Sequence, residues 1–287
     1  IEQTPGFHAG LRGGDVIEFI DGKPTKNMSQ DEAVSLMRGE PGAKVILGIR
    51  KKNGEFHDVP IIREVIEVRS ITKQVLFDDG IGYVRLSSFS ERSAQELDQA
   101  LSALESQGMR SLILDLRGNP GGLLTAAIEV ANQFIPEGPI LHVVGRNSVT
   151  QTVEAFPEAA HRSYPMIVMV DGYSASASEI VSGALKDTGL ATLVGAQTFG
   201  KGLVQTVIPL RDGSALSLTT ARYQTAGGND IHAVGIQPDV IVELPEGEEP
   251  PYYASDVEGG NGVDVANDIQ LQAALELLGF QALKKAS

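Results

Sequence analysis

Apolar residues in the middle of the chain follow two alternating patterns. Residues 111–116 (SLILDL) and 165–170 (PMIVMV) are short, nearly continuous apolar runs, which is typical of buried strands. Elsewhere apolar residues recur every three or four positions, as on one face of a helix. One such stripe consists of Leu97, Ala100, Leu101 and Leu104, and the other of Leu124, Ala127, Ile128 and Ala131. This alternation predicts an α/β core with helices packed on a sheet.

The first of these helices has sequence signals at both ends. Ser93 and Glu96 have the spacing of a capping box, and Gly108 follows the last apolar position. Further strands are expected at residues 81–89, 191–195, 203–210 and 214–223.

The N-terminal block has a different pattern. Residues 10–25 (GLRGGDVIEFIDGKPT) predict a strand that ends in an Asp-Gly turn. Ser29 and Glu32 form a second capping-box pattern, which predicts a helix that reaches Met37. Residues 43–61 then read as two strands joined by an Asn-Gly turn.

These patterns divide the chain into three parts. Residues 1–64 form the N-terminal block, and residues 65–244 form the alternating core. Residues 245–287 begin as an acidic linker rich in proline and glycine. They end in a helix expected to pack on the core, with an apolar face of Leu271, Ala274, Leu275 and Leu278.

Composition excludes several classes of function. A net charge of −14 argues against nucleic acid or an anionic membrane as a partner, because few cations are available to neutralise phosphates. The chain has no cysteine, so it has no disulfide framework, thiolate metal site or cysteine nucleophile. It contains no apolar run of about 18 residues and no visible signal peptide. Because it opens within what reads as a domain, we expect a piece of a longer protein.

Two turns after predicted buried strands are candidates for chemistry, because ligands of open α/β sheets bind beyond the carboxyl ends of strands. The first is RGNPGG (117–122), which is either an ordinary tight turn or a source of backbone N–H groups for an oxyanion. The second is GYSASASE (172–179), where three serines precede a helix. Serine at this position is commonly a helix cap, but small neighbours around a hydroxyl also leave room for a substrate carbonyl.

A serine nucleophile needs a base, and the five histidines of the chain lie in no motif-like setting. Lys201 lies between two glycines and before an apolar run, although most loop lysines are simply solvated. A lysine acts as a base only when neutral, which requires its pKa to fall from about 10.4 to about 7–8. Burial among apolar side chains would favour this, and we expect Phe199, Leu203 and Val204 to form the walls.

The motifs together resemble a known family. LDLRGNPGGLL (114–124), GYSASASEIVSGAL (172–185) and VGAQTFGKGLVQTVIPL (194–210) occur in the order and spacing of the C-terminal processing (tail-specific) serine proteases. The N-terminal block, in TPGFHAGLRGGDVIEFIDGKPT (4–25) and SQDEAVSLMRG (29–39), is similar to a PDZ domain without its beginning. The resemblance implies an α/β (mixed α+β) protease core with an N-terminal, partly truncated PDZ domain hinged over the active site.

The resemblance also implies roles for individual residues. Ser176 would be the nucleophile, Lys201 the general base and Gln205 the residue that holds the lysine. The oxyanion donors would be the N–H groups of Ala177 and Gly122, with Gly121 as the alternative to Gly122. Neither a metal nor a cofactor is required.

The function implied is cleavage of C-terminal regions of proteins, or of unfolded proteins, with the PDZ domain binding C-termini and gating the site. The implied partners are protein or peptide substrates, an adaptor or activator protein, and further copies of the chain through segments absent from this sequence. The implied location is the periplasm or cell envelope of a bacterium. Two alternatives stay open: a non-proteolytic peptide-binding scaffold, and an ester hydrolase, against which the absence of a G-x-S-x-G elbow speaks.

Overall fold

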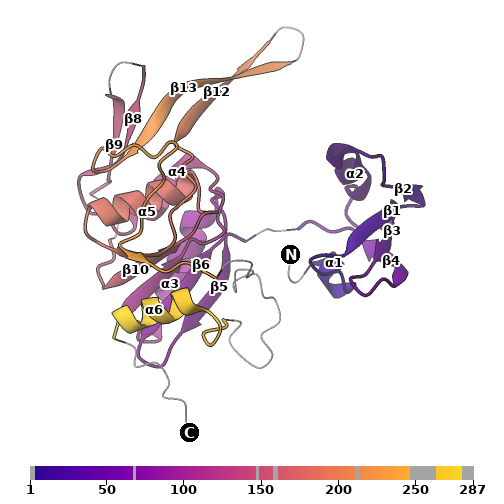
Figure 1. Cartoon of the computed structure of the whole chain (residues 1–287), viewed down its shortest axis with the longest axis horizontal. Coiled ribbons are helices and arrows are strands. Elements are labelled where there is room, and N and C mark those ends of the chain that lie inside the picture. The colour runs from indigo at the N-terminus through magenta and orange to yellow at the C-terminus, as the bar shows by residue number, and fades with distance from the viewer. Residues whose placement is uncertain are drawn as a thin grey trace. The chain divides into compact units, whose positions relative to one another are not determined.

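A computed structural model describes residues 4–66, 69–146, 149–157, 161–210, 214–245 and 263–279. The chain folds into two compact units, Ile1–Val68 and Arg69–Ser287 (Figure 1). The C-terminal helix belongs to the second unit.

The first unit contains one antiparallel sheet and two short helices. Its elements are α1 (Pro5–His8), β1 (Val16–Ile20), β2 (Lys23–Pro24), α2 (Gln30–Met37), β3 (Lys44–Arg50) and β4 (Phe56–Ile62). The sheet order is β2-β1-β3-β4, and its small core centres on Ile20, Val45, Leu47 and Ile49. Half of the predicted capping box of α2 is found, because Glu32 N donates to Ser29 Oγ at 3.2 Å.

The second unit is built on a six-stranded sheet with the order β14-β11-β10-β7-β6-β5. Only β5 runs antiparallel to its neighbour. The strands are β5 (Ile71–Leu76), β6 (Ile81–Leu86), β7 (Ser111–Asp115), β10 (Met166–Val170), β11 (Thr192–Gly195) and β14 (Val240–Ile241). The helices are α3 (Ser93–Ser106), α4 (Leu124–Asn132), α5 (Ala177–Asp187) and α6 (Ile269–Leu277).

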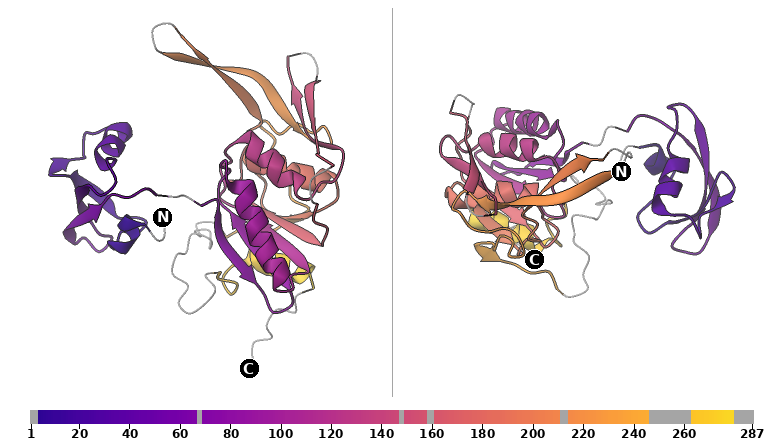
Figure 2. Two further views of the ribbon diagram at one scale, coloured as in Figure 1. Left: turned by 180° about the vertical axis from the view of Figure 1, so that it is seen from behind. Right: turned by 90° about the horizontal axis from the view of Figure 1, so that it is seen from above.

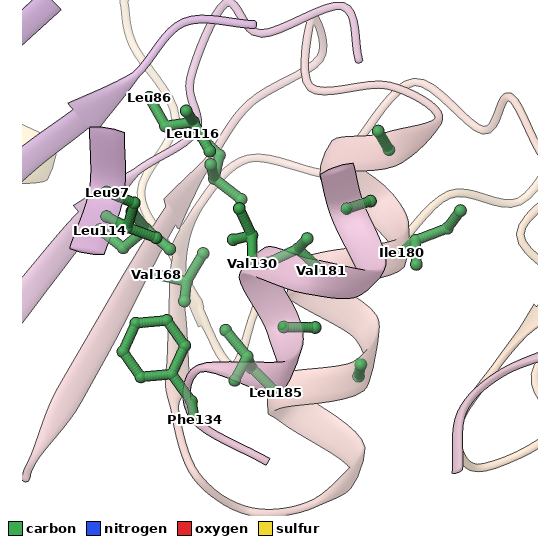
Figure 3. Close-up of a cluster of buried hydrophobic side chains, with 14 of the residues drawn as sticks. Leu86, Leu97, Leu114, Leu116, Val130, Phe134, Val168, Ile180, Val181 and Leu185 are labelled. Carbon is green, nitrogen blue, oxygen red and sulfur yellow. The ribbon is translucent and has the colours of Figure 1, made fainter. Parts of the chain in front are cut away.

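Helices cover both faces of this sheet, so its central strands are buried throughout. Leu112 and Leu114 of β7 share a core cluster with α3, α4 and α5, and Figure 3 shows Leu114 beside Leu97 of α3. Ile113, between them in sequence, belongs to the cluster that contains Leu271 of α6. This period-2 alternation therefore puts α6 on the face opposite to the other helices.

A second, antiparallel sheet has the order β12-β13-β8-β9. Its strands are β8 (Pro139–Val144), β9 (Val149–Glu154), β12 (Leu203–Pro209) and β13 (Ala215–Thr225). The β12–β13 pair, drawn in orange, extends beyond the helices of its unit in both views of Figure 2. Its register shifts between Val204 and Gln205, so β12 is bent shortly after Lys201.

The predicted apolar helix faces are largely found. Leu97, Leu101 and Leu104 of α3 are buried, as are Leu271 and Leu275 of α6. In α4 the fully buried side is shifted to Ala126, Ala127, Val130 and Ala131, with Leu124 and Ile128 at its border. None of the described helices is both long and apolar enough to cross a membrane.

The predicted capping box at Ser93 is wrong. The helix begins at Ser93 itself, and its preceding residue, Arg92, makes no capping bond through its side chain. The Glu96 carboxylate instead accepts the N–H groups of Ser70 at 2.8 Å and Ile71 at 3.2 Å. Long-range hydrogen bonds to the start of β5 have thus replaced the local cap.

Candidate active site

The two turns predicted to carry chemistry follow adjacent parallel strands. Residues 117–122 follow β7, and residues 172–176 follow β10, which pairs with β7 in register. The turns therefore meet at the carboxyl edge of the sheet. If a Cβ were added to Gly121, it would lie 3.0 Å from Ser176 Cβ, so only glycine permits this approach.

Ser176 lies at the junction between its turn and helix α5. Its backbone has φ 55° and ψ −110°, a conformation that non-glycine residues rarely adopt and that costs about 1–3 kcal/mol. The sequence lacks the G-x-S-x-G elbow, yet the geometry is of that kind, with a strained serine between a strand and a helix. Ser176 is half-buried, and the amino end of α5 lies directly behind it.

The three serines of this turn have different environments in the structure. Ser174 and Ser178 are fully buried, and their hydroxyls donate to the carbonyl oxygens of Leu116 and Asn119, each at 2.8 Å. These two hydroxyls join the serine turn to the 117–122 turn. Ser176 is the serine that remains accessible to a ligand.

The backbone N–H groups of Ala177, the first residue of α5, and of Gly122 have no acceptor among the described residues. Gly121 differs, because its N–H donates to Asn119 Oδ1 at 2.9 Å. The N–H of Gly121 is thus already used, and Gly121 is the residue that allows the close approach of the two turns.

A buried carboxylate, that of Glu179, joins the serine turn to the lysine loop. Its Oε2 accepts the N–H of Ser176 at 2.8 Å and the N–H of Lys201 at 2.9 Å. Its Oε1 accepts the N–H of Gly200 and the hydroxyl of Thr198, both at 2.6 Å. Since one oxygen receives both the Ser176 and the Lys201 amide, the two backbones are fixed side by side.

The side chain of Lys201 does not enter the core. It is exposed, and Phe199, expected as an apolar wall, is 65% exposed; Leu203 and Val204 are half-buried. Among the described residues, its amine makes no hydrogen bond or ion pair. The flanking glycines serve the backbone: Gly200 has φ 88°, and a Cβ on Gly202 would lie 2.7 Å from His232 N. Gln205, at the bend of β12, is also exposed.

The 117–122 turn is anchored by charged groups. Asp171 Oδ1 accepts the N–H groups of Gly118 at 2.9 Å and Ser174 at 3.0 Å, which ties the two turns together. Arg117, fully buried, pairs with Asp115 through two hydrogen bonds of 3.0 and 2.7 Å. Burial alone would raise the pKa of Asp115, but the charges of Arg117 and Arg85 lower it to about 2.

Sequence reasoning missed most of these supporting residues. Glu179 is three positions after Ser176, which is capping-box spacing, so its contact with the Ser176 amide was open to prediction. Its contacts with residues 198–201 were not, because they join segments about twenty positions apart. The same holds for Asp171 and Asn119, whose partners lie on other strands and turns.

Models of two protein families match this chain. Residues 80–242 match the family described as peptidase family S41, and residues 1–51 match a PDZ domain family. The chain is 41% identical over 281 residues to a carboxyl-terminal-processing protease of Synechocystis sp., covering 96% of this chain and 62% of that protein. It is 38% identical over 282 residues to the carboxy-terminal processing protease CtpA of Bacillus subtilis, covering 98% and 60%.

The solved structure of a photosystem II D1 C-terminal processing protease is similar, with a TM-score of 0.59 and 33% identity. The match covers 83% of this chain and 66% of that one. The chain spans less than two thirds of the length of the two curated relatives. The S41 match covers more than half of the chain and includes the serine turn, the lysine loop and the 117–122 turn. The chain belongs to peptidase family S41, with a PDZ domain ahead of its core.

Proposed function

We propose that this chain is the PDZ and catalytic part of a carboxyl-terminal processing endopeptidase of the serine type. The observation that carries the proposal is the environment of Ser176. This serine is strained and accessible and directly precedes α5, and in the part of the chain that the structure describes the N–H groups of Ala177 and Gly122 have no acceptor. Together with membership of the S41 family, these features support acyl transfer to Ser176.

In the proposed mechanism, the neutral amine of Lys201 accepts the proton of Ser176 Oγ as this oxygen attacks a peptide carbonyl. The N–H groups of Ala177 and Gly122 stabilise the oxyanion. The lysine then protonates the leaving amine, and a water activated by the same lysine releases the acyl group. Gln205 holds the lysine in position during these steps.

The exposure of Lys201 in the free chain adds a condition to this mechanism. A polypeptide lying across the site would cover the amine and exclude water from it, which is the environment that a lysine base requires. Substrate binding therefore completes the site. We propose that the PDZ domain, by binding the C-terminus of a protein substrate, controls how often this happens.

The remaining parts of the proposal concern the setting of the enzyme. The substrates are C-terminal regions of proteins, or unfolded proteins, in the bacterial periplasm or cell envelope. An adaptor or activator protein and further copies of the chain are the proposed partners. The names of the relatives support C-terminal processing, whereas the location and the partners rest on family resemblance.

Degradation of casein between pH 6 and pH 10 tests the proposal. We expect hydrolysis by the wild type, with a rate that rises with pH, and none by Ser176→Ala or Lys201→Ala. His232→Ala is the matched control, because His232 is exposed and its backbone adjoins Gly202 in the lysine loop. Loss of activity in this control together with a rate that titrates near 6.5, the ordinary pKa of histidine, would overturn the lysine assignment.

Two further results would change the proposal in other ways. Folded wild type without activity towards casein or an unstructured peptide would favour a peptide-binding scaffold. Removal of residues 1–68 should change the rate and the choice of substrate, measured with two proteins that differ in their C-terminal residues. Unchanged cleavage of both would exclude gating by the PDZ domain.

A further inference from the structure

Arg117, the first residue of the 117–122 turn, uses its whole guanidinium group in buried hydrogen bonds. Nε and Nη2 donate to Asp115, as described above. Nη1 and Nη2 also donate to Asp268, at 2.9 and 2.7 Å, and Nη1 donates to Gln270 Oε1 at 3.0 Å. These bonds match the five N–H donors that arginine presents in a planar fork, so the group has one fixed orientation.

Two of the three acceptors belong to the C-terminal segment. Asp268 is the N-cap of α6, and its Oδ1 also accepts the N–H of Leu271 at 3.0 Å. Gln270, in the first turn of α6, donates from Nε2 to the carbonyl of Val242 at 2.6 Å. Both side chains are nearly fully buried. They lie beyond residue 242, where the match to the S41 family ends.

The contact bears on the site because Arg117 opens the turn that presents Gly122. Beyond Arg117, the turn is held at Gly118 by Asp171 and at Asn119, whose Nδ2 donates to the carbonyl of Leu86 at 2.8 Å. Its strand end is held by the guanidinium. Without the Asp268 carboxylate, Arg117 would keep a buried charge after losing the acceptors of two of these five hydrogen bonds, and it would move or draw in water.

We propose that Asp268 is a positioning residue for the Gly122 N–H group, acting through Arg117, so that α6 is part of the catalytic support. The inference rests on the proposed function, because it assumes that Gly122 stabilises an oxyanion. An oxyanion donor contributes to the rate only while its direction is fixed before the reaction. Looseness at Arg117 should therefore weaken transition-state binding and leave substrate binding nearly unchanged.

The test measures Asp268→Asn in the full chain with a fluorogenic peptide that the wild type cleaves. We expect kcat to fall by about 10- to 100-fold, less than the 10²–10³-fold that removal of a whole donor costs, with little change in KM. A peptidyl boronic acid forms a tetrahedral adduct with the serine and places one oxygen between the oxyanion donors. Its affinity should fall by the same factor as kcat, whereas the affinity of the cleaved product peptide should not change.

Leu275→Ala is the matched control. Leu275 is buried on the same helix and belongs to the apolar cluster on that face, with no role in the Arg117 hydrogen bonds. This variant should lower the melting temperature at least as much as Asp268→Asn, yet keep kcat close to the wild-type value when measured well below that temperature. An equal loss of kcat in both variants would overturn the inference, since general loosening of α6 would then explain it.

The remaining outcomes are distinct. An active wild type and an equally active, folded Asp268→Asn would overturn the inference and leave the proposed function intact. If the wild type showed no hydrolysis that is lost in Ser176→Ala, both the inference and the proposed function would be overturned. If Asp268→Asn does not fold, Gln270→Met removes one acceptor of Arg117 and keeps a side chain of similar length. A kcat reduced several-fold at constant KM would support positioning, and an unchanged kcat would overturn it.

Discussion

Replacing Glu179 with glutamine isolates the charge that joins the serine turn to the lysine loop. The substitution keeps the length and shape of a side chain that is fully buried. It removes one of two acceptor oxygens, which together receive three backbone N–H groups and the Thr198 hydroxyl. The new amide nitrogen must therefore face groups that themselves donate.

The size of the effect follows from these contacts. The orientation of lowest cost keeps the remaining oxygen at the amides of Ser176 and Lys201, because the Thr198 hydroxyl on the other side can turn and accept. Gly200 N–H then has no acceptor, and a buried donor left without a partner costs about 1–3 kcal/mol. With the weaker bonds of a neutral acceptor, we expect a total loss of about 2–4 kcal/mol in the free energy of unfolding. For a domain of this size, that lowers the melting temperature by roughly 5–15 °C.

Activity should fall further than stability alone would explain. Displacement of a reacting group by about 1 Å can cost 10²-fold in rate, so we expect kcat to fall by about 10- to 100-fold at temperatures where the variant is folded. The assays are peptide hydrolysis and thermal unfolding followed by circular dichroism. Ser182→Ala is the matched control, because it lies one turn later in α5, equally buried, with a single long bond of 3.4 Å to a backbone carbonyl. If Glu179→Gln had the same melting temperature and kcat as this control, Glu179 would not hold the serine turn and the lysine loop together.

Three further predictions concern the turns around the site. Because the charges around Asp115 lower its pKa to about 2, from an ordinary 3.9, they contribute roughly 2–3 kcal/mol of stability above pH 4. This contribution should disappear as the pH falls from 4 to 2. The measurement is urea unfolding of the wild type at each pH, and a midpoint that stays constant over this range would contradict the prediction. Gly121→Ala should reduce activity at least 10-fold. The new side chain would strain the backbone by about 1–3 kcal/mol, since the residue has φ 99° and the added Cβ would lie 2.7 Å from Ala175 O. Turnover like that of the wild type would refute the close approach of the two turns. Ser178→Ala should lose only about 0.5–1.5 kcal/mol in urea unfolding and keep most of its activity, because its hydroxyl makes one structural bond; an inactive but stable Ser178→Ala would question the choice of Ser176.

Much of the fold could be predicted because burial imposes a period on the sequence. The stripe on α3 and the apolar runs of β7 and β10 are found in the structure, since one face of the helix and both faces of these strands are buried. β2, β5, β8, β9 and β14 were not predicted. The sequences of β5 and β9, ITKQVL and VTQTVE, are at least half polar, and both are edge strands with one side in solvent.

The site could be predicted only where its signal is local. The pattern SASAS gave no means of choosing among three serines, apart from resemblance to a family. The structure distinguishes them through partners on another turn, because Ser174 and Ser178 bond to the carbonyls of residues 116 and 119. The capping box expected at Ser93 failed for the same reason, since Glu96 found partners 25 and 26 positions away. Local spacing indicates which hydrogen bonds a side chain could form, and tertiary contacts determine which of them it does form.

In the proposed mechanism, the division between buried and exposed groups in this site matches what each group must do. Oxyanion donors are effective only if they point at the charge before it forms, and backbone N–H groups can be fixed only by holding the chain around them. The carboxylates of Glu179, Asp171 and Asp268 do this from positions that are almost completely buried. In the proposed mechanism Lys201 first accepts a proton and then returns it, and its side chain is exposed in the free chain. Substitutions beneath the turns should therefore lower kcat for every substrate, whereas changes that hinder the closure over Lys201 should depend on which substrate is bound.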